Sequence, residues 1–371
     1  MSTNSVLDHH FSLVVSAMPD VDWIPGSGQG RSGLQGAFDA MNTTAFQSLT
    51  SALLIAIAAA WAAPADASVN VSISGDDALA TISLTDVAMN TYDAEVSIHF
   101  DTPTDLTAAN LNLTAELVNP TDPVLLARLQ QPLLDCTTLT NILPGLTTLV
   151  CNLILNPLLS LGGGVSVDPN FPMLITVEPI DNQWIFHGGF ELNSSADGNL
   201  HFLNAYEFEL HAIGPMYSAG TPYRLYKAPL LGQFQDQTSA VNNGSVRARG
   251  RSGGFSQFIM VKDTRPTLLV ALGKTVNLEL RTLGSTLNAT LQGDLTGLLT
   301  DVLNLLLTPL NPNYAAAIAK ADAFDAEVVA NAGTEIDNEW RAQRDLINDE
   351  GDLRGSVAAL RFTLVRGQSG F

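Results

Sequence analysis

Apolar and polar residues alternate along much of the chain after residue 67, with the period of two that is typical of half-buried β-strands. The alternation is clear at 69–73, 80–84, 95–100 and 110–118, and turn-forming residues such as Gly75 separate consecutive runs. Short strands at this spacing predict a β-sandwich-like region.

A second strand-rich region begins near Val165 and extends to about Leu283. Its clearest feature is a predicted hairpin of 183–192 with 200–213, in which aromatic residues share the core-facing sides. These residues are Trp184, Phe186 and Phe190 on the first strand and Phe202, Tyr206 and Phe208 on the second. Further strands are predicted at 223–226, 245–251, 255–262, 267–272 and 275–281.

Two leucine-rich segments interrupt the strands, at about 124–161 and 297–310. Pro144 breaks the first segment, which predicts a helix–turn–helix hairpin. Residues 145–158 match 297–310 at a constant offset, which suggests an approximate duplication of strands followed by an apolar helix. One interpretation is that these helices pack against the sandwiches, and the other is that they line an apolar cavity or contact lipid.

The end of the chain changes pattern twice. Between 314 and 346 apolar residues recur every three or four positions, which predicts a helix weakened by Gly333. Between 355 and 366, Leu360, Phe362 and Leu364 alternate, which predicts a last strand. The predicted fold is therefore mainly β, with two tandem β-sandwich-like regions, Leu-rich helical insertions and a C-terminal helix.

An apolar run at 51–63 is too short for a transmembrane helix of roughly 20 residues and precedes the A-x-A pattern at 65–67. We interpret 41–67 as a signal peptide cleaved after Ala67, with Met41 as the initiator, although 41–47 contains no Lys or Arg. A buried apolar helix is the alternative.

These boundaries divide the chain into five parts. Residues 1–40 are a non-native or disordered leader, and 41–67 are the signal peptide. Residues 68–164 form a β-sandwich-like region with a disulfide-linked helical hairpin, and 165–312 a second β-rich region with a Leu-rich helix. Residues 313–371 contain a C-terminal helix and strand.

Composition restricts the class of protein further. Of the 371 residues, 46% are hydrophobic and 15% charged, which excludes a disordered chain. The net charge of −20 argues against nucleic acid or anionic lipid as a partner. No transmembrane segment is predicted in the mature chain.

The chain contains two cysteines, Cys136 and Cys151, which lie on either side of Pro144. An antiparallel hairpin would bring them together, and an exported protein favours a disulfide between them. Such a bond closing this loop would contribute about 3 kcal/mol in the chain-entropy model. Two buried free thiols are the alternative.

Histidine and glutamate residues form the strongest polar cluster of the sequence. On the outer face of the predicted hairpin lie His187, Glu191, His201, Glu209 and His211. Such residues could bind zinc or act in acid–base chemistry. The same residues also fit the solvated face of an antiparallel sheet, and no motif spacing favours a metal.

Arg247, Arg249 and Arg251 alternate and therefore share one face of a predicted strand. They could bind a carboxylate or phosphate, or they could face water beside acidic neighbours. The chain has no G-x-S-x-G, H-E-x-x-H, P-loop or dinucleotide fingerprint, so we predict no cofactor.

Two stretches, PYRLYKAPL at 222–230 and GSVRARGRSGGFSQF at 244–258, carry a family resemblance. The segment 221–266 resembles part of a family of uncharacterised secreted bacterial proteins of unknown function. This resemblance implies export and an all-β module, and it implies no activity and no functional residues.

The sequence therefore predicts a secreted or periplasmic, non-enzymatic binding or structural protein of the envelope or extracellular space. Its partner is unknown and could be an apolar small molecule or another envelope protein. One alternative is a carrier that holds an apolar ligand between the Leu-rich helices and the sheets. The second alternative is a metal-dependent enzyme at the histidine-bearing sheet face.

Overall fold

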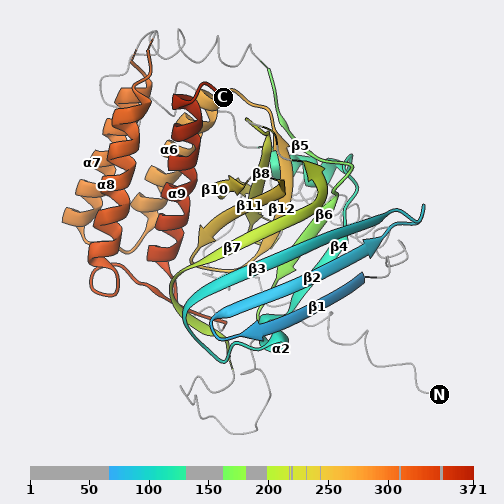
Figure 1. Cartoon of the computed structure of the whole chain (residues 1–371). Helices are drawn as coiled ribbons and strands as arrows, with labels where there is room; N and C mark the ends of the chain where they lie inside the picture. Colours follow the sequence, from blue (N-terminus) through green and yellow to red (C-terminus); the bar gives the residue numbers. More distant parts are fainter. Residues whose placement is uncertain are drawn as a thin grey trace, which may run out of the picture. The chain divides into compact units, whose positions relative to one another are not determined.

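Alternating burial along the strands produces two antiparallel sheets in the computed structural model (Figure 1). The structure describes residues 67–130, 162–180 and 199–371, except 217, 219, 231, 243, 309–310 and 343–345. All of these residues belong to one unit, Pro64–Phe371.

The larger sheet exposes one polar face and buries the other. In β2 every second residue from Ala78 to Leu84 is buried. Within the described residues its strands, in spatial order, are β1 (Ala67–Ser74), β2 (Asp77–Thr85), β3 (Thr91–Thr104), β7 (His201–Met216), β11 (Ser245–Ser252) and β10 (Thr238–Asn242). The short β13 (Glu339–Arg341) also pairs with β7.

The smaller sheet is buried on both faces in its centre, where β12 has almost no exposed residue. Its described strands, in spatial order, are β4 (Leu113–Leu117), β6 (Met173–Val177), β12 (Gln257–Asp263), β8 (Tyr223–Ala228) and β9 (Gln235–Asp236). β5 (Val165–Val167) pairs with the far end of β12. The short helices α2 (Ala108–Leu111) and α3 (Pro123–Leu129) flank β4, and α3 packs on the second face of the sheet.

The two sheets form a β-sandwich around one apolar core. Phe208 of the larger sheet stacks on Phe258 of the smaller sheet, with their ring centroids 4.0 Å apart. Both side chains are buried, as are Tyr206 and Met260 beside them. The structure is thus mainly β, and the predicted core face of Phe202, Tyr206 and Phe208 is confirmed.

The two predicted tandem regions share both sheets. β3 from the first region pairs with β7 from the second in the larger sheet, and β4 pairs with β6 in the smaller sheet. Neither region therefore closes a sandwich by itself, because each lacks the partners that its central strands require. The alternation identified the strands correctly but contained no information on their long-range pairing.

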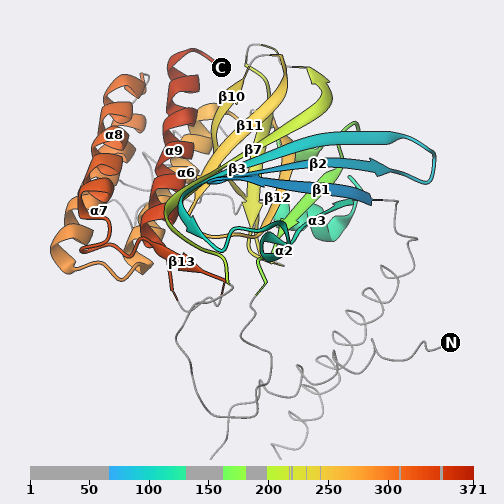
Figure 2. The same ribbon diagram turned by 60° about the horizontal axis from the view of Figure 1, so that its bottom comes forward.

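Four long helices form a bundle beside the sandwich (Figures 1 and 2). They are α6 (Thr267–Gly284), α7 (Ala289–Leu306), α8 (Tyr314–Asn331) and α9 (Asp349–Gln368). Each contributes apolar residues at three- and four-residue spacing to a second core, such as Leu353, Val357, Leu360 and Leu364 of α9.

The strands predicted at 267–272 and 275–281 were wrong, because both segments belong to α6. Val270 with Leu272, and Val276 with Leu278, imitate the alternation of a strand. Buried Thr275 and Thr282 instead donate hydrogen bonds to the carbonyls of Ala271 and Leu278, four residues earlier, as they do in helices. Contacts on two sides decide the conformation here, because α6 lies between the bundle and the sandwich.

The last predicted strand, 355–366, was also wrong, because it lies inside α9. Asn348 caps this helix by accepting a hydrogen bond from the backbone of Gly351, and acidic residues follow in the first turn. Two glycines then bring α9 close to β11. A Cβ at Gly355 would stand 2.2 Å from the carbonyl oxygen of Arg251, so only glycine fits there.

The helix predicted over 314–346 is shorter in the structure and ends at Asn331. Gly333, which we expected to weaken its middle, adopts a φ of 69° beyond the end of the helix, a conformation that favours glycine. The chain then returns to the sandwich, where Trp340 of β13 stacks on Phe202.

Several predictions concern residues outside the described part of the chain. These are the leader and signal peptide before residue 67, the leucine-rich hairpin after residue 130 with Cys136 and Cys151, and the predicted strand 183–192. Among the helices that the structure describes, none is long and apolar enough to cross a membrane.

Candidate ligand-binding cavity

The predicted histidine cluster is dispersed along β7. His201 and His211 are ten residues apart on this strand, a separation of about 30 Å at the rise of a β-strand. Each has its own carboxylate partner: His201 Nε2 lies 2.6 Å from Glu339, and His211 Nδ1 lies 2.9 Å from Glu95. The described residues contain no group of acidic, histidine and cysteine side chains that could hold a metal ion, and His187 and Glu191 lie outside them.

The three arginines of β11 form ion pairs with glutamates of the neighbouring strand. Arg249 Nη2 lies 2.8 Å from Glu209, and Arg251 pairs with Glu207. Arg247 is more distant, 3.9 Å from Glu209. This geometry is that of a partly exposed cross-strand ladder on the outer face of the larger sheet, in which acidic neighbours neutralise the arginines.

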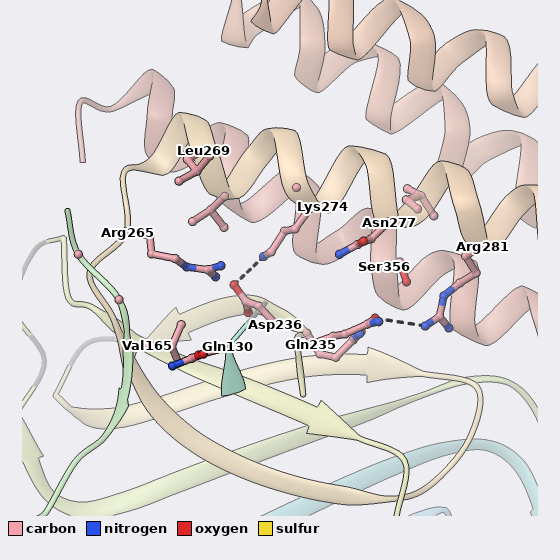
Figure 3. A pocket seen from close by; sticks show the side chains of 16 residues that line it. Gln130, Val165, Gln235, Asp236, Arg265, Leu269, Lys274, Asn277, Arg281 and Ser356 are labelled. Carbon is pink, nitrogen blue, oxygen red and sulfur yellow. Dashed lines mark hydrogen bonds and ion pairs between the residues drawn. The ribbon is translucent and has the colours of Figure 1, made fainter. Parts of the chain in front are cut away.

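A different group of polar residues surrounds a cavity of about 360 Å³ below α6, which we call the α6 cavity (Figure 3). Its wall combines α6, Ser356 of α9, the end of α3, the start of β5, and β9 with its following residue. Gly163 forms part of this wall. Only glycine fits at this position, because its φ is 92° and a Cβ would stand 2.3 Å from the carbonyl oxygen of Thr264. The cavity therefore lies where the sandwich meets the bundle.

Arg265 follows the end of β12, and its side chain enters the cavity. Hydrogen bonds to Asp263 and Tyr226 hold its guanidinium group in place. Its Nε donates to Asp263 at 2.9 Å, and its Nη2 donates to Asp263 at 2.7 Å and to the hydroxyl of Tyr226 at 2.8 Å. Burial opposes the ionisation of Asp263, but the hydrogen bonds and charge of Arg265 outweigh it and hold the pKa of Asp263 below its usual value. The guanidinium is thus held in one orientation.

Lys274 links three elements across the same wall. Its Nζ lies 2.7 Å from Asp236 of β9, and it donates to the carbonyl of Ala359 and the hydroxyl of Thr363, each at 2.9 Å. Burial lowers the pKa of Lys274, and the charge of Asp236 opposes this shift. All three protons of the ammonium group therefore have an acceptor within the protein.

Arg281 lies two turns further along α6 and points toward β9 (Figure 3). Its Nη1 is 2.9 Å from Asp352, and its Nη2 donates to the side-chain oxygen of Gln235 at 3.3 Å. Burial opposes the ionisation of Asp352, but Arg281 and Lys227 overcome it and lower the pKa of this carboxyl.

Two side-chain amides of the wall differ from these bonded groups. Gln237 is only 7% exposed, and Asn277 points from α6 into the cavity between Lys274 and Arg281 (Figure 3). Neither amide has a hydrogen-bond partner among the described residues. Because an amide both donates and accepts hydrogen bonds, these two groups are available to a molecule within the cavity.

Sequence reasoning missed this site. Lys274, Asn277 and Arg281 recur at three- and four-residue spacing, which places them on one side of a helix but would scatter them over a strand. The strands predicted at 267–272 and 275–281 conceal this spacing, because they follow the alternation of apolar residues and leave Lys274 between two elements. Pro266 at the start of the segment was the available signal of a helix beginning.

Fold and site together define a β-sandwich joined to a four-helix bundle, with a polar cavity at the junction. The chain belongs to DUF6689, a family of unknown function whose model matches residues 51–154 and 148–367. No curated protein and no solved structure matches the chain.

Proposed function

We propose that this protein is an exported, non-enzymatic binding protein that holds a small water-soluble molecule in the α6 cavity. The observation that carries the proposal is the side-chain amide of Gln237, a residue that lines the cavity, is only 7% exposed and has no side-chain hydrogen-bond partner among the described residues. A ligand in the cavity can bond to this amide without displacing a partner of the protein.

The size of the cavity supports a small-molecule ligand. Its volume of about 360 Å³ falls at the lower end of the range of pockets that bind small molecules. Leu269 and Val270 give part of the wall apolar surface, while amides and charged groups provide directional contacts. This mixture favours a polar ligand over the apolar one that the carrier hypothesis requires.

The charged groups of the wall support binding more than catalysis. Lys274 uses all its protons within the protein, and Asp236 is occupied by Lys274 and by the backbone of Thr238. A general base or nucleophile needs a group that can reach the substrate. These groups are instead arranged to hold the wall in place.

Export is supported by the sequence alone, through the apolar run at 51–63 and the A-x-A pattern that follows it. N-terminal sequencing of protein from the native host tests it: a mature terminus at Ser68 is expected. Recovery of the chain with its terminus at Ser2 would contradict export.

Binding in the α6 cavity is tested by screening water-soluble metabolites for those that raise the melting temperature, with native mass spectrometry to confirm a complex. Asn277→Leu should weaken binding of a hit at least tenfold, because one hydrogen bond is lost and a polar ligand group faces an apolar side chain. Asn304→Leu, the same change on the exposed face of α7, is the matched control. A hit that binds both variants equally, or the absence of any hit, would contradict the proposed site.

A further inference from the structure

We propose that the ligand of the α6 cavity carries a carboxylate or phosphate group that lies against Arg265, while its uncharged polar part bonds to Gln237 and Asn277. This inference rests on the proposed binding function and adds the chemical class of the ligand. Three observations carry it: the excess of positive charge around the cavity, the open position on Arg265, and the unpaired amides.

The charged groups around the cavity are more often positive than negative. Among the described residues, three cations line the cavity, Arg265, Lys274 and Arg281, and one carboxylate, Asp236. Asp263 and Asp352, which pair with Arg265 and Arg281, do not belong to the lining. The lining therefore has two positive charges in excess, although the chain as a whole has a net charge of −20.

Two further buried cations, Arg224 and Lys227, lie outside the lining but interact with the carboxylates beside it. Arg224 donates to the carbonyls of Thr221 and Tyr223 and forms no ion pair within the described residues, and the Nζ of Lys227 is 4.0 Å from Asp352, which Arg281 already occupies. Burial lowers the pKa of both, to about 8 for Lys227. Both cations therefore add positive charge behind the cavity wall, which favours an anion within the cavity.

Arg265 is positioned to receive that anion. Its Nε and Nη2 are held by Asp263 and Tyr226, while Nη1 has no partner among the described residues. Figure 3 shows Arg265 and Lys274 approaching Asp236 within the same cavity. A guanidinium that is already fixed loses little conformational entropy when it binds an oxyanion, which strengthens the interaction.

The rest of the cavity suits an uncharged polar part. Asn277 lies three residues after Lys274 and four before Arg281, so all three side chains share one side of α6. Gln237 lies opposite, beside Gly355, with its oxygen 3.3 Å from where a Cβ on that glycine would stand. Amides donate and accept, and therefore match hydroxyl and amide groups of a ligand.

Pairs of probes that differ only in the acidic group test the inference by calorimetry on the full chain. Glucuronate and glucose 6-phosphate are compared with glucose, which separates a carboxylate from a phosphate. We expect at least one acid to bind at least tenfold more tightly than glucose, with an affinity that falls as salt rises. If the acids bind no better than glucose, or if every hit of the metabolite screen is neutral, the inference is overturned while binding itself stands.

Arg265→Lys locates the anion without removing the charge that Asp263 needs. Lysine cannot retain the bonds to Asp263 and Tyr226 and also present the Nη1 position, so affinity for the acid should fall at least tenfold while any affinity for glucose is unchanged. Arg361→Lys, at an exposed position of α9 paired with Asp322, is the control. Unchanged acid binding in Arg265→Lys, with the fold intact by circular dichroism, would place the anion elsewhere.

Discussion

The interface between the two sheets is apolar, whereas the interface between the sandwich and the bundle contains charged side chains. Between the sheets, apolar side chains such as Phe208 and Phe258 meet without a charge. Between sandwich and bundle, Asp236 of β9 meets Lys274 of α6, and Lys227 of β8 lies 4.0 Å from Asp352 of α9. The first interface is suited to stability, whereas the second sacrifices some of it, because buried ion pairs are often no better than apolar packing.

The difference between the two interfaces indicates which one serves ligand binding as well as stability. A bundle could be attached to a sandwich by leucines, as its own four helices are attached to one another. Charges at this junction instead surround a cavity and hold its wall in a fixed arrangement. We therefore expect changes between the sheets to act on stability alone, and changes at the junction to act on stability and ligand binding together.

The largest effect is expected between the sheets. Phe208→Ala removes a ring that stacks at 4.0 Å on Phe258 and leaves a cavity in a fully buried core. The free energy of unfolding should fall by about 4 kcal/mol in urea titrations. Phe371→Ala, at a half-exposed position, is the control and should cost much less. A loss below about 1 kcal/mol for Phe208→Ala would show that the two sheets do not share a close-packed core.

Lys274→Met should have the next largest effect, because it leaves Asp236 buried without its cation. We expect a loss of about 3 kcal/mol. Asp236→Asn in the same chain should restore much of this loss, since the amide oxygen can still accept from the backbone of Thr238. If the two substitutions are additive in a double-mutant cycle, the ion pair does not couple α6 to β9.

Glu279→Gln should stabilise the protein in a pH-dependent way. Burial raises the pKa of Glu279 in α6 to about 7, whereas the unfolded chain ionises it near 4.5. The folded state therefore retains the proton longer, and stability falls as pH rises from about 4.5 to 7. The glutamine variant escapes this loss.

We expect Glu279→Gln to be about 2 kcal/mol more stable than the wild type at pH 8, and nearly equal to it near pH 4.5. Chemical denaturation at the two pH values measures the difference. Glu116→Gln, at an exposed position of β4, should change neither value. Equal stability of Glu279→Gln and wild type at pH 8 would mean that Glu279 is solvated in the folded protein.

The sequence allowed the sandwich to be predicted better than the bundle, for a physical reason. In β2 and β7 one face contacts the core and the other contacts water. The alternation of apolar and polar residues therefore predicts which side chains are buried, such as Ile82 and Phe208. α6 and α9 contact neighbours on two sides, and their patterns therefore mix periods. Leu360, Phe362 and Leu364 look like a strand until the contacts of Leu353 and Val357 are known.

The α6 cavity was harder still to predict. Its residues come from segments as distant as Gly163, Asp236 and Arg281, and only the folded chain brings them together. The polar residues that the sequence did single out and that the structure describes lie on β7 and β11, where they pair with oppositely charged neighbours on the outer face of the sheet. A polar residue on a regular face is easy to find and is often only solvated, whereas the polar residues of the cavity were obscured by apolar neighbours.

The smallest effect is expected on the outer face of the larger sheet, where ion pairs are partly exposed. Arg251→Gln removes the partner of Glu207, and both side chains are about one-third exposed. We expect a loss of about 0.5 kcal/mol that disappears at high salt, because water replaces the arginine around the glutamate. The loss in Lys274→Met should persist at the same salt concentration, because ions do not reach a buried pair. If Arg251→Gln cost as much as Lys274→Met, burial would not be what distinguishes the junction from the surface.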